Sequence, residues 1–263
     1  MCIRDSCCYR PSTVQVNPVI LLEMRSLHDM VAFLEKQIWF PEPRRYDRYL
    51  KEGLLAVGGD LSVRRLKLAY EKGIFPWTDD PITWWCPQQR GVFELNKVHI
   101  SRSLRRVLKK QRFDVTFNAA FDKVIEACAK MPRPGGWITP RFIRAYQQMH
   151  DQGCAHSVEC WHEGSLVGGV YGVQVGAAFA GESMFYRVSN ASKVALLHLL
   201  RALRDRGWRL VDIQMLTPVT QSLGALYISR ETYLDRLEIA RSHTCTFPTG
   251  PSQYGCASQW SSL

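Results

Sequence analysis

The chain has 263 residues and a formal net charge of +10, with 46% hydrophobic and 22% charged residues, which are ordinary proportions for a globular protein. No stretch reaches the roughly 18 consecutive apolar residues of a membrane-spanning helix, and the nine cysteines show neither Cys-x-x-Cys pairs nor zinc-spaced Cys/His clusters. These features exclude the membrane-spanning class and predict a soluble, cytoplasmic protein without a bound metal, whose positive charge favours a nucleic acid or another polyanion as partner.

The two ends of the chain carry no periodic pattern. Met1–Ser6 lacks the apolar core of a secretory signal and resembles a translated sequencing adapter, so we expect residues 1–22 to be a non-native or disordered leader. Residues 241–263 are rich in Ser, Thr, Gly and Pro and show neither helical nor strand spacing, which predicts a loose C-terminal tail.

The segment after the leader predicts a small N-terminal domain over residues 23–82. Helical spacing of apolar residues predicts a helix over 27–36, which the prolines that follow bring to an end. Ser62 is a suitable N-cap for a second helix, and Gly73 is placed to close it.

A strongly basic stretch follows at residues 97–112, which hold seven Lys or Arg residues and no acid. Ser101 predicts the start of a helix on which four basic side chains share one face and apolar side chains the other. The basic face consists of Arg102, Arg105, Arg106 and Lys109. Such a face is either simply solvated or binds nucleic-acid phosphates, and the absence of acidic partners favours phosphate binding.

Residues 83–240 predict a larger α+β domain. A strand at 113–117 and two helices, over 121–128 and 142–149, precede three strands with short connections, at 156–161, 166–173 and 177–185. These three strands predict an antiparallel meander, because turn-like residues such as Glu163–Gly164 join them. A helix over 195–205 and a buried strand at 209–215 then complete a mixed sheet of the acetyltransferase-like (GNAT-like) kind.

Polar residues in the buried strands are the candidate site. The two-residue period of a strand places Asp212 and Gln214 on one face, where an unpaired carboxylate or amide is costly to bury. Glu182 lies between a glycine and two large apolar residues, and its pattern fits a structural hydrogen-bonding hub as well as a substrate-binding group. Trp77 and Trp137 are similarly open to two interpretations, core packing and ligand binding.

A set of ordered motifs resembles the bacterial leucyl/phenylalanyl-tRNA–protein transferases. The resemblance runs from about Phe40 to Leu237, and its motifs keep the same order at compatible spacings. The motifs are Gly53–Ser62, Ala69–Tyr70, Gly73–Trp77, Trp84–Trp85 with Pro87 and Arg90, Trp137–Ile138, Ala155–Glu159, Leu166–Gly172, Gly181–Phe185, Asn190–Lys193, Asp212-x-Gln214 and Ser222–Ala225.

This resemblance implies a monomeric enzyme without a cofactor. It would move Leu or Phe, and Met less well, from aminoacyl-tRNA to proteins that begin with Arg or Lys, marking them for degradation by the N-end rule pathway. By matching position, Asp212 and Gln214 are the catalytic pair, and Glu182 holds the acceptor or orients the pair.

The resemblance also implies where the aminoacyl-tRNA lies. Trp77 and Trp137, with Tyr70 as a further candidate, would bind the terminal adenosine of the tRNA. Val170, Phe179 and Met184 are our candidates for the pocket that takes the aminoacyl side chain, and the basic helix would contact the tRNA backbone.

The residue types suit this chemistry. The donor ester is already activated, and the reference pKa of an acceptor α-amine, about 7.7–8.0, leaves part of it neutral, so positioning and removal of one proton are the main requirements. Because an amide is a very poor base, we interpret Gln214 as orienting the amine and Asp212 as polarising Gln214 or taking the proton through a relay.

The sequence also departs from the family pattern. Ile213, Tyr186 and Val219 stand where Cys, Ser and His are common, and Cys86 replaces a Ser. Two other functions remain alternatives. A coenzyme-A-dependent acetyltransferase is disfavoured because residues 188–193 contain no glycine to cradle a pyrophosphate, and a non-catalytic RNA-binding protein leaves Asp212 and Gln214 unexplained.

Overall fold

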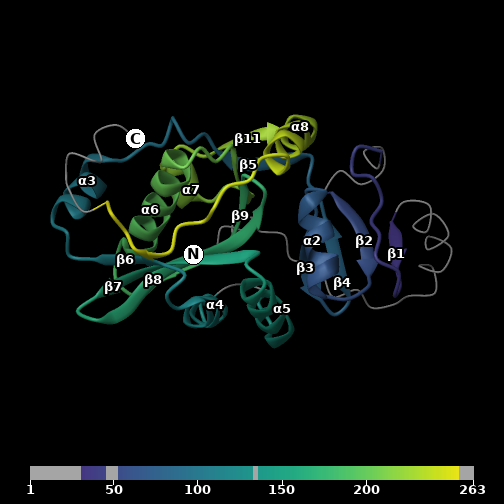
Figure 1. The fold of residues 1–263 in the computed structure, drawn as a ribbon, viewed down its shortest axis with the longest axis horizontal. Helices are drawn as coiled ribbons and strands as arrows, with labels where there is room; N and C mark the ends of the chain where they lie inside the picture. The colour runs from purple at the N-terminus through teal and green to yellow at the C-terminus, as the bar shows by residue number, and fades with distance from the viewer. Residues whose placement is uncertain (1–30, 46–52, 133–135, 255–263) are drawn as a thin grey trace.

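The computed structural model describes residues 31–45, 53–132 and 136–254. A four-stranded sheet with one helix lies at one end of the molecule, and an eight-stranded sheet covered by helices on both faces forms the rest (Figure 1). The predicted leader over 1–22 lies outside the described residues. Within these ranges, no helix combines the length and the apolar character needed to cross a membrane.

The four-stranded sheet has the order β1-β2-β4-β3. Its strands are β1 (Ala32–Leu34), β2 (Leu54–Gly58), β3 (Phe75–Asp79) and β4 (Ile82–Trp85), and α2 (Val63–Glu71) connects β2 to β3. The predicted cap is confirmed, because the Ser62 hydroxyl accepts a hydrogen bond from the Arg65 amide. The domain boundary expected after residue 82 falls within β4, and the large sheet begins at Gln89.

The helix expected over 27–36 is wrong in its described part. Ala32–Leu34 forms β1, which pairs in parallel with β2. Ala32 and Leu34 are buried and Phe33 is exposed, so the apolar residues follow the two-residue period of a strand. Residues 27–30 lie outside the described part of the chain.

The eight-stranded sheet has the order β11-β5-β10-β9-β8-β7-β6-β12, and all neighbours are antiparallel except β9 and β10. The predicted α+β class, the meander and the mixed sheet are therefore confirmed. Its strands are β5 (Gln89–Phe93), β6 (Asp114–Phe117), β7 (Ala155–His162), β8 (Ser165–Val175), β9 (Ala178–Tyr186), β10 (Leu210–Gln214), β11 (Leu226–Ser229) and β12 (Gly250–Pro251).

Helices cover both faces of this sheet. Figure 1 shows α4 (Phe121–Ala129) and α5 (Pro140–Asp151) on one face and α6 (Ala191–Asp205) on the other. The other helices of the described residues, besides α2, are α3 (Arg102–Lys109), α7 (Pro218–Ser222) and α8 (Arg230–Arg241).

Two large apolar cores result. One lies between α6 and the sheet. The other is continuous from the small sheet to α4 and α5, and it joins Phe75 and Trp84 to Phe142 and Tyr146.

The described part of the tail packs against the domain, in contrast to the loose segment expected from composition. β12 pairs with β6, and the Phe247 ring stacks on His156 with centroids 4.2 Å apart and an interplanar angle of 5°. The Gln174 amide donates to the carbonyl of Cys245 at 2.7 Å. Two buried aromatic side chains, Phe247 and Tyr254, and a few hydrogen bonds thus anchor the segment, and such contacts leave no periodic pattern in the sequence.

We expect His156 to make the fold sensitive to acid. Burial lowers the pKa of His156 to about 4, and the neutral ring bonds to Asn118 and Gln174 at 3.0 Å each. Between the ordinary histidine pKa of 6.5 and about 4, the unfolded chain binds more protons than the folded one. The free energy of unfolding should therefore fall as the pH drops through this window, with His156 contributing on the order of 3 kcal/mol.

Urea denaturation from pH 7 to pH 4 measures this dependence. His156→Gln should make it shallower, with the buried His198 retaining the rest, whereas the same substitution at the exposed His243 should leave it unchanged. Parallel curves for the wild type and His156→Gln would contradict the assignment.

Candidate active site

The strands β9 and β10 separate at the point where the predicted site residues lie. Their parallel pairing ends at Asp212 opposite Ala180. Beyond it, Glu182 occupies a bulge in β9, and Gln214 has a positive φ of 55° at a register shift in β10. Because backbone pairing stops here, side chains of the two strands meet instead.

A chain of hydrogen bonds connects these side chains to the small sheet. The Gln214 amide nitrogen Nε2 donates to Glu182 Oε1 at 2.9 Å, and the Tyr146 hydroxyl donates to Glu182 Oε2 at 3.1 Å. The hydroxyls of Tyr70 and Tyr146 lie 2.6 Å apart. All four side chains are buried, and they come from α2, α5, β9 and β10.

The bond between Gln214 and Glu182 fixes the orientation of the amide. A carboxylate accepts hydrogen bonds, so the amide nitrogen of Gln214 must face Glu182 and the carbonyl oxygen must point away from it. This arrangement supports an orienting role for Glu182 and holds one polar oxygen at a defined position.

Asp212 lies beside this chain in a buried ion pair. Arg90 on β5 donates from Nε to Oδ1 at 2.8 Å and from Nη2 to Oδ2 at 2.6 Å. The Tyr233 hydroxyl donates to Oδ2 at 3.0 Å, and the backbone amide of Gln214 donates to Oδ1 at 2.8 Å. Burial alone would lower the pKa of Arg90, but the attraction of Asp212 outweighs it and the pKa is raised.

The structure brings together the three residues predicted as catalytic. Gln214 contacts Glu182 through its side chain and Asp212 through its backbone. The alternate residues Val211 and Ile213 pack into the core beneath α6, as the strand period predicted.

Three further residues of this network were not predicted. Tyr146 fits the apolar face of a helix, Arg90 was only part of a motif, and Tyr233 had no distinguishing pattern. An arginine directly before the apolar residues 91–93 of β5 was a usable indication of a buried partner.

The residues predicted to bind the adenosine lie on two segments that are tied together. Trp77 is half-buried on β3, and Trp137 is buried just before α5. The Thr139 hydroxyl donates to the carboxylate of Asp79, and Arg141 donates to the Asp79 carbonyl at 2.5 Å. Trp77 thus lies two residues before Asp79, and Trp137 lies two residues before Thr139, so this hydrogen bond holds the two segments together close to both tryptophans.

The three residues predicted for a side-chain pocket are fully buried on the α6 side of the sheet. Val170 pairs with Met184 across β8 and β9. Phe179 stacks with Phe247 at 5.6 Å between centroids. The structure therefore groups these side chains in one apolar core, close to the separation of β9 and β10.

The basic helix α3 forms as predicted. The Ser101 hydroxyl accepts from the Leu104 amide, and Leu104 and Leu108 are buried. Arg102, Arg106 and Lys109 are exposed, whereas Arg105 is half-buried and donates to the carbonyl of Ile100 at 3.1 Å.

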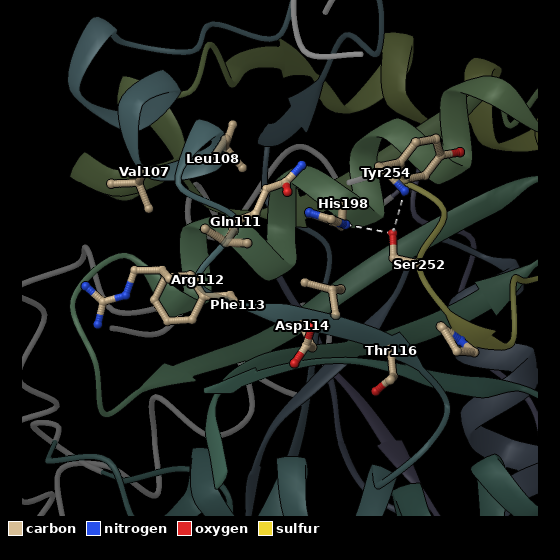
Figure 2. Close-up of a pocket in the computed structure, with 13 residues that line it drawn as sticks. Val107, Leu108, Gln111, Arg112, Phe113, Asp114, Thr116, His198, Ser252 and Tyr254 are labelled. Atoms are coloured by element: carbon tan, nitrogen blue, oxygen red, sulfur yellow. Dashed lines mark hydrogen bonds between the residues drawn. The ribbon is translucent and has the colours of Figure 1, made fainter. Parts of the chain in front are cut away.

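A hollow of about 470 Å³ lies beside the end of α3 (Figure 2). Arg112 and Asp114 line it on one side and His198 on another, where His198 Nδ1 lies 2.7 Å from the Ser252 hydroxyl. None of the residues predicted as catalytic lines this hollow. The candidate active site at Glu182 and Gln214 is therefore separate from this hollow.

The departures from the family pattern lie around the network. Ile213 is in the core under α6, Val219 is partly buried against the same core, and Tyr186 is 44% exposed at the end of β9. Cys86 is buried, and burial raises the pKa of its thiol.

Comparisons with known proteins agree with the resemblance. The family model described as leucyl/phenylalanyl-tRNA protein transferase matches residues 92–238, and the model of its N-terminal domain matches residues 59–88. A relative of that name from Syntrophotalea carbinolica is 51% identical over 201 residues, which cover 74% of this chain and 87% of the relative. Another from Pectobacterium atrosepticum is 48% identical over 220 residues, covering 81% and 93%.

Solved structures are more distant. L-PGS from Bacillus licheniformis is 12% identical with a TM-score of 0.36, and covers 60% of this chain and 51% of its own. A GCN5-related N-acetyltransferase-like protein from Streptococcus suis is 16% identical with a TM-score of 0.31, and covers 60% of each chain. At these scores, neither likeness bears on the activity.

The two tyrosine hydroxyls should be energetically coupled. Tyr146→Phe removes a donor to Glu182 and the partner of Tyr70, and we expect it to lower the free energy of unfolding by about 1–3 kcal/mol. Tyr70→Phe should cost less, and the double variant should cost less than the sum because both substitutions remove the same bond. Urea denaturation of the four proteins measures the coupling, and strictly additive losses would contradict it.

Proposed function

This chain belongs to the leucyl/phenylalanyl-tRNA–protein transferase family, and we propose that the network around Gln214 catalyses transfer of leucine or phenylalanine from aminoacyl-tRNA to a protein N terminus. The observation that carries this proposal is the Gln214 amide, held by Glu182 where β9 and β10 separate. The amide is a buried polar group in a defined orientation beside an apolar core, which suits an amine and an aminoacyl ester meeting there.

The reaction needs positioning and one proton transfer. The acceptor nitrogen attacks the ester carbonyl carbon, an amide bond forms, and the bond to the ribose oxygen of the terminal adenosine breaks. The nitrogen loses a proton, and the ribose oxygen gains one. Gln214 accepts a hydrogen bond from the amine through its carbonyl oxygen and so orients the attacking lone pair.

Glu182 supports this step through Gln214. As the amine attacks, positive charge develops on its nitrogen, and a nearby buried carboxylate stabilises that charge. The bond from Gln214 to Glu182 also keeps the amide from rotating, so the oxygen stays directed at the amine. Gln214 itself takes no proton, because an amide is a very poor base.

The donor is held at both of its ends. Trp77 and Trp137 stack on the terminal adenosine, and Tyr70 supports the same region from α2. Val170, Phe179 and Met184 surround the leucine or phenylalanine side chain. An apolar enclosure of this kind discriminates by about 1–3 kcal/mol for one methylene and rejects charged side chains through the cost of burying them.

Membership of the family supports a proposal for the biological context. We propose that acceptors begin with Arg or Lys, that the modified proteins are then degraded by the N-end rule pathway, and that the enzyme acts as a monomer in the cytoplasm. Aminoacyl-tRNA and the acceptor protein are its two substrates.

The basic helix α3 is proposed to contact the tRNA backbone. Arg102, Arg106 and Lys109 expose their charges on one face, while the opposite face is anchored in the core by Leu104 and Leu108. A rigid row of cations attracts phosphates without reading base sequence.

Replacing Gln214 tests the catalytic proposal. We expect Gln214→Ala to lower kcat for transfer of labelled leucine from charged tRNA to an Arg-initiated peptide by about 100-fold, with little change in KM, because the amine loses its orienting acceptor. Glu182→Gln keeps one oxygen that can accept from the Gln214 amide but replaces the other carboxylate oxygen with an NH2 group and loses the charge, and it should lower kcat by about tenfold.

The matched control is Gln221→Ala, which removes an exposed glutamine from α7 and should remain fully active. An active Gln214→Ala variant would refute the assignment. Acetyl transfer from acetyl-coenzyme A without leucine transfer would instead identify an acetyltransferase, and tRNA binding without either activity would identify a binding protein.

The α3 proposal is tested by salt dependence. Arg102→Ala/Lys109→Ala should weaken tRNA binding and reduce the slope of log affinity against log salt by about one for each phosphate that the helix no longer neutralises. Lys123→Ala/Arg206→Ala removes the same charge from exposed positions on α4 and at the end of α6. Equal slopes for the two double variants, measured by filter binding, would exclude a specific role for α3.

A further inference from the structure

We propose that Arg90 and Tyr233 are positioning residues for the transfer reaction, which hold Asp212 so that its carboxylate fixes the backbone of Gln214, and that Asp212 takes no proton. This inference rests on the function proposed above and assigns Asp212 a different role from the relay expected from sequence.

Arg90 is fixed on every side. Its guanidinium lies 4.8 Å from the ring centroid of Phe75 and 4.3 Å from that of Tyr233. Nη1 donates to the carbonyl of Gly73 at 2.9 Å, while Nε and Nη2 bind Asp212. Such a parallel pair of bonds defines the plane of the carboxylate as well as its position.

Asp212 has no remaining capacity to act as a base. Each carboxylate oxygen accepts two hydrogen bonds, Oδ1 from Arg90 and the Gln214 amide, and Oδ2 from Arg90 and Tyr233. Two oxygens offer about four lone-pair sites, so all are used. A proton would have to displace one of these donors inside a buried site that already contains a neutralising cation.

The bond from Asp212 to the Gln214 amide holds an unusual backbone. Gln214 has a φ of 55°, which is uncommon for residues other than glycine, and the Met215 amide donates to the Ile213 carbonyl at 2.6 Å across the turn. Opposite this turn, a Cβ atom on Gly91 would lie only 3.0 Å from the Met215 carbonyl carbon. The turn directs the Gln214 side chain to Glu182, so the conformation of one residue determines where the amide points.

The same guanidinium connects the small sheet to the reacting centre. Gly73 and Phe75 precede Trp77 on the segment proposed to bind adenosine, and both contact Arg90. Arg90 therefore sets the position of the adenosine-binding segment relative to Gln214.

Tyr233→Phe tests this inference, because it removes one donor to Asp212 and keeps the ring beneath Arg90. We expect kcat to fall by about tenfold and KM for aminoacyl-tRNA to change by less than about twofold. The midpoint of the acid limb of kcat/KM against pH should stay where the wild type has it, because the acceptor amine sets that limb. Exchange of the Gln214 amide hydrogen, followed by NMR, should become about tenfold faster.

Val115→Ala is the control for a general loss of stability, because it removes core volume from β6, at the opposite side of the sheet. If Tyr233→Phe loses no more kcat than Val115→Ala, Arg90 and Tyr233 serve only the fold. A shift of the acid limb in Tyr233→Phe would show that the contact between Tyr233 and Asp212 takes part in the proton transfer. Either result overturns the proposal.

A second variant and the activity of the wild type complete the experiment. If Tyr233→Phe does not fold, Arg90→Lys replaces it, since lysine keeps the charge but provides no pair of parallel bonds. If the wild type transfers no leucine, the proposed function fails, whereas unchanged amide exchange in an active Tyr233→Phe refutes the positioning role alone.

Discussion

The buried pair of Arg90 and Asp212 is the interaction on which the rest of the site depends. The pair itself joins β5 to β10, and it is hydrogen-bonded to Gly73 just before β3, to Gln214 at the end of β10 and to Tyr233 on α8, so a single group of charges joins elements that are distant in sequence. Buried ion pairs add little to stability in general, because desolvation offsets the attraction. Here the main role of the pair is to fix the relative positions of these elements, because its hydrogen bonds form only when every one of the elements is in place.

Local patterns in the sequence predicted much of the fold and part of the site. The caps at Ser62 and Ser101 and the meander are short-range features, and the structure confirms them. The helix expected over 27–36 was mispredicted in its described part because a few apolar residues fit both periods, and pairing with β2 decided the outcome. Strand alternation placed Asp212 and Gln214 on one face, but the bulge at Glu182 and the turn at Gln214 depend on neighbouring strands. Tyr146, Arg90 and Tyr233 were missed because their roles arise from contacts between segments that are far apart in the chain.

The network combines two kinds of buried polar group with different properties. Asp212 is neutralised by a fixed cation and surrounded by donors, which suits a structural anchor. Glu182 accepts hydrogen bonds from the neutral amide of Gln214 and the hydroxyl of Tyr146, which hold its carboxylate against the Gln214 side chain. The two carboxylates therefore have different roles: Asp212 holds the backbone of Gln214, and Glu182 holds its side chain.

The continuous core between the small sheet and helices α4 and α5 has a consequence for how the protein denatures. Phe75 and Trp84 are enclosed by residues of both sheets, so detaching the small sheet would expose much of the shared core to water. Loss of the small sheet would therefore also uncover apolar side chains of the main domain, among them Phe142 and Tyr146. We expect substitutions in the strands of the small sheet, far from Gln214, to lower the stability of the main domain as well.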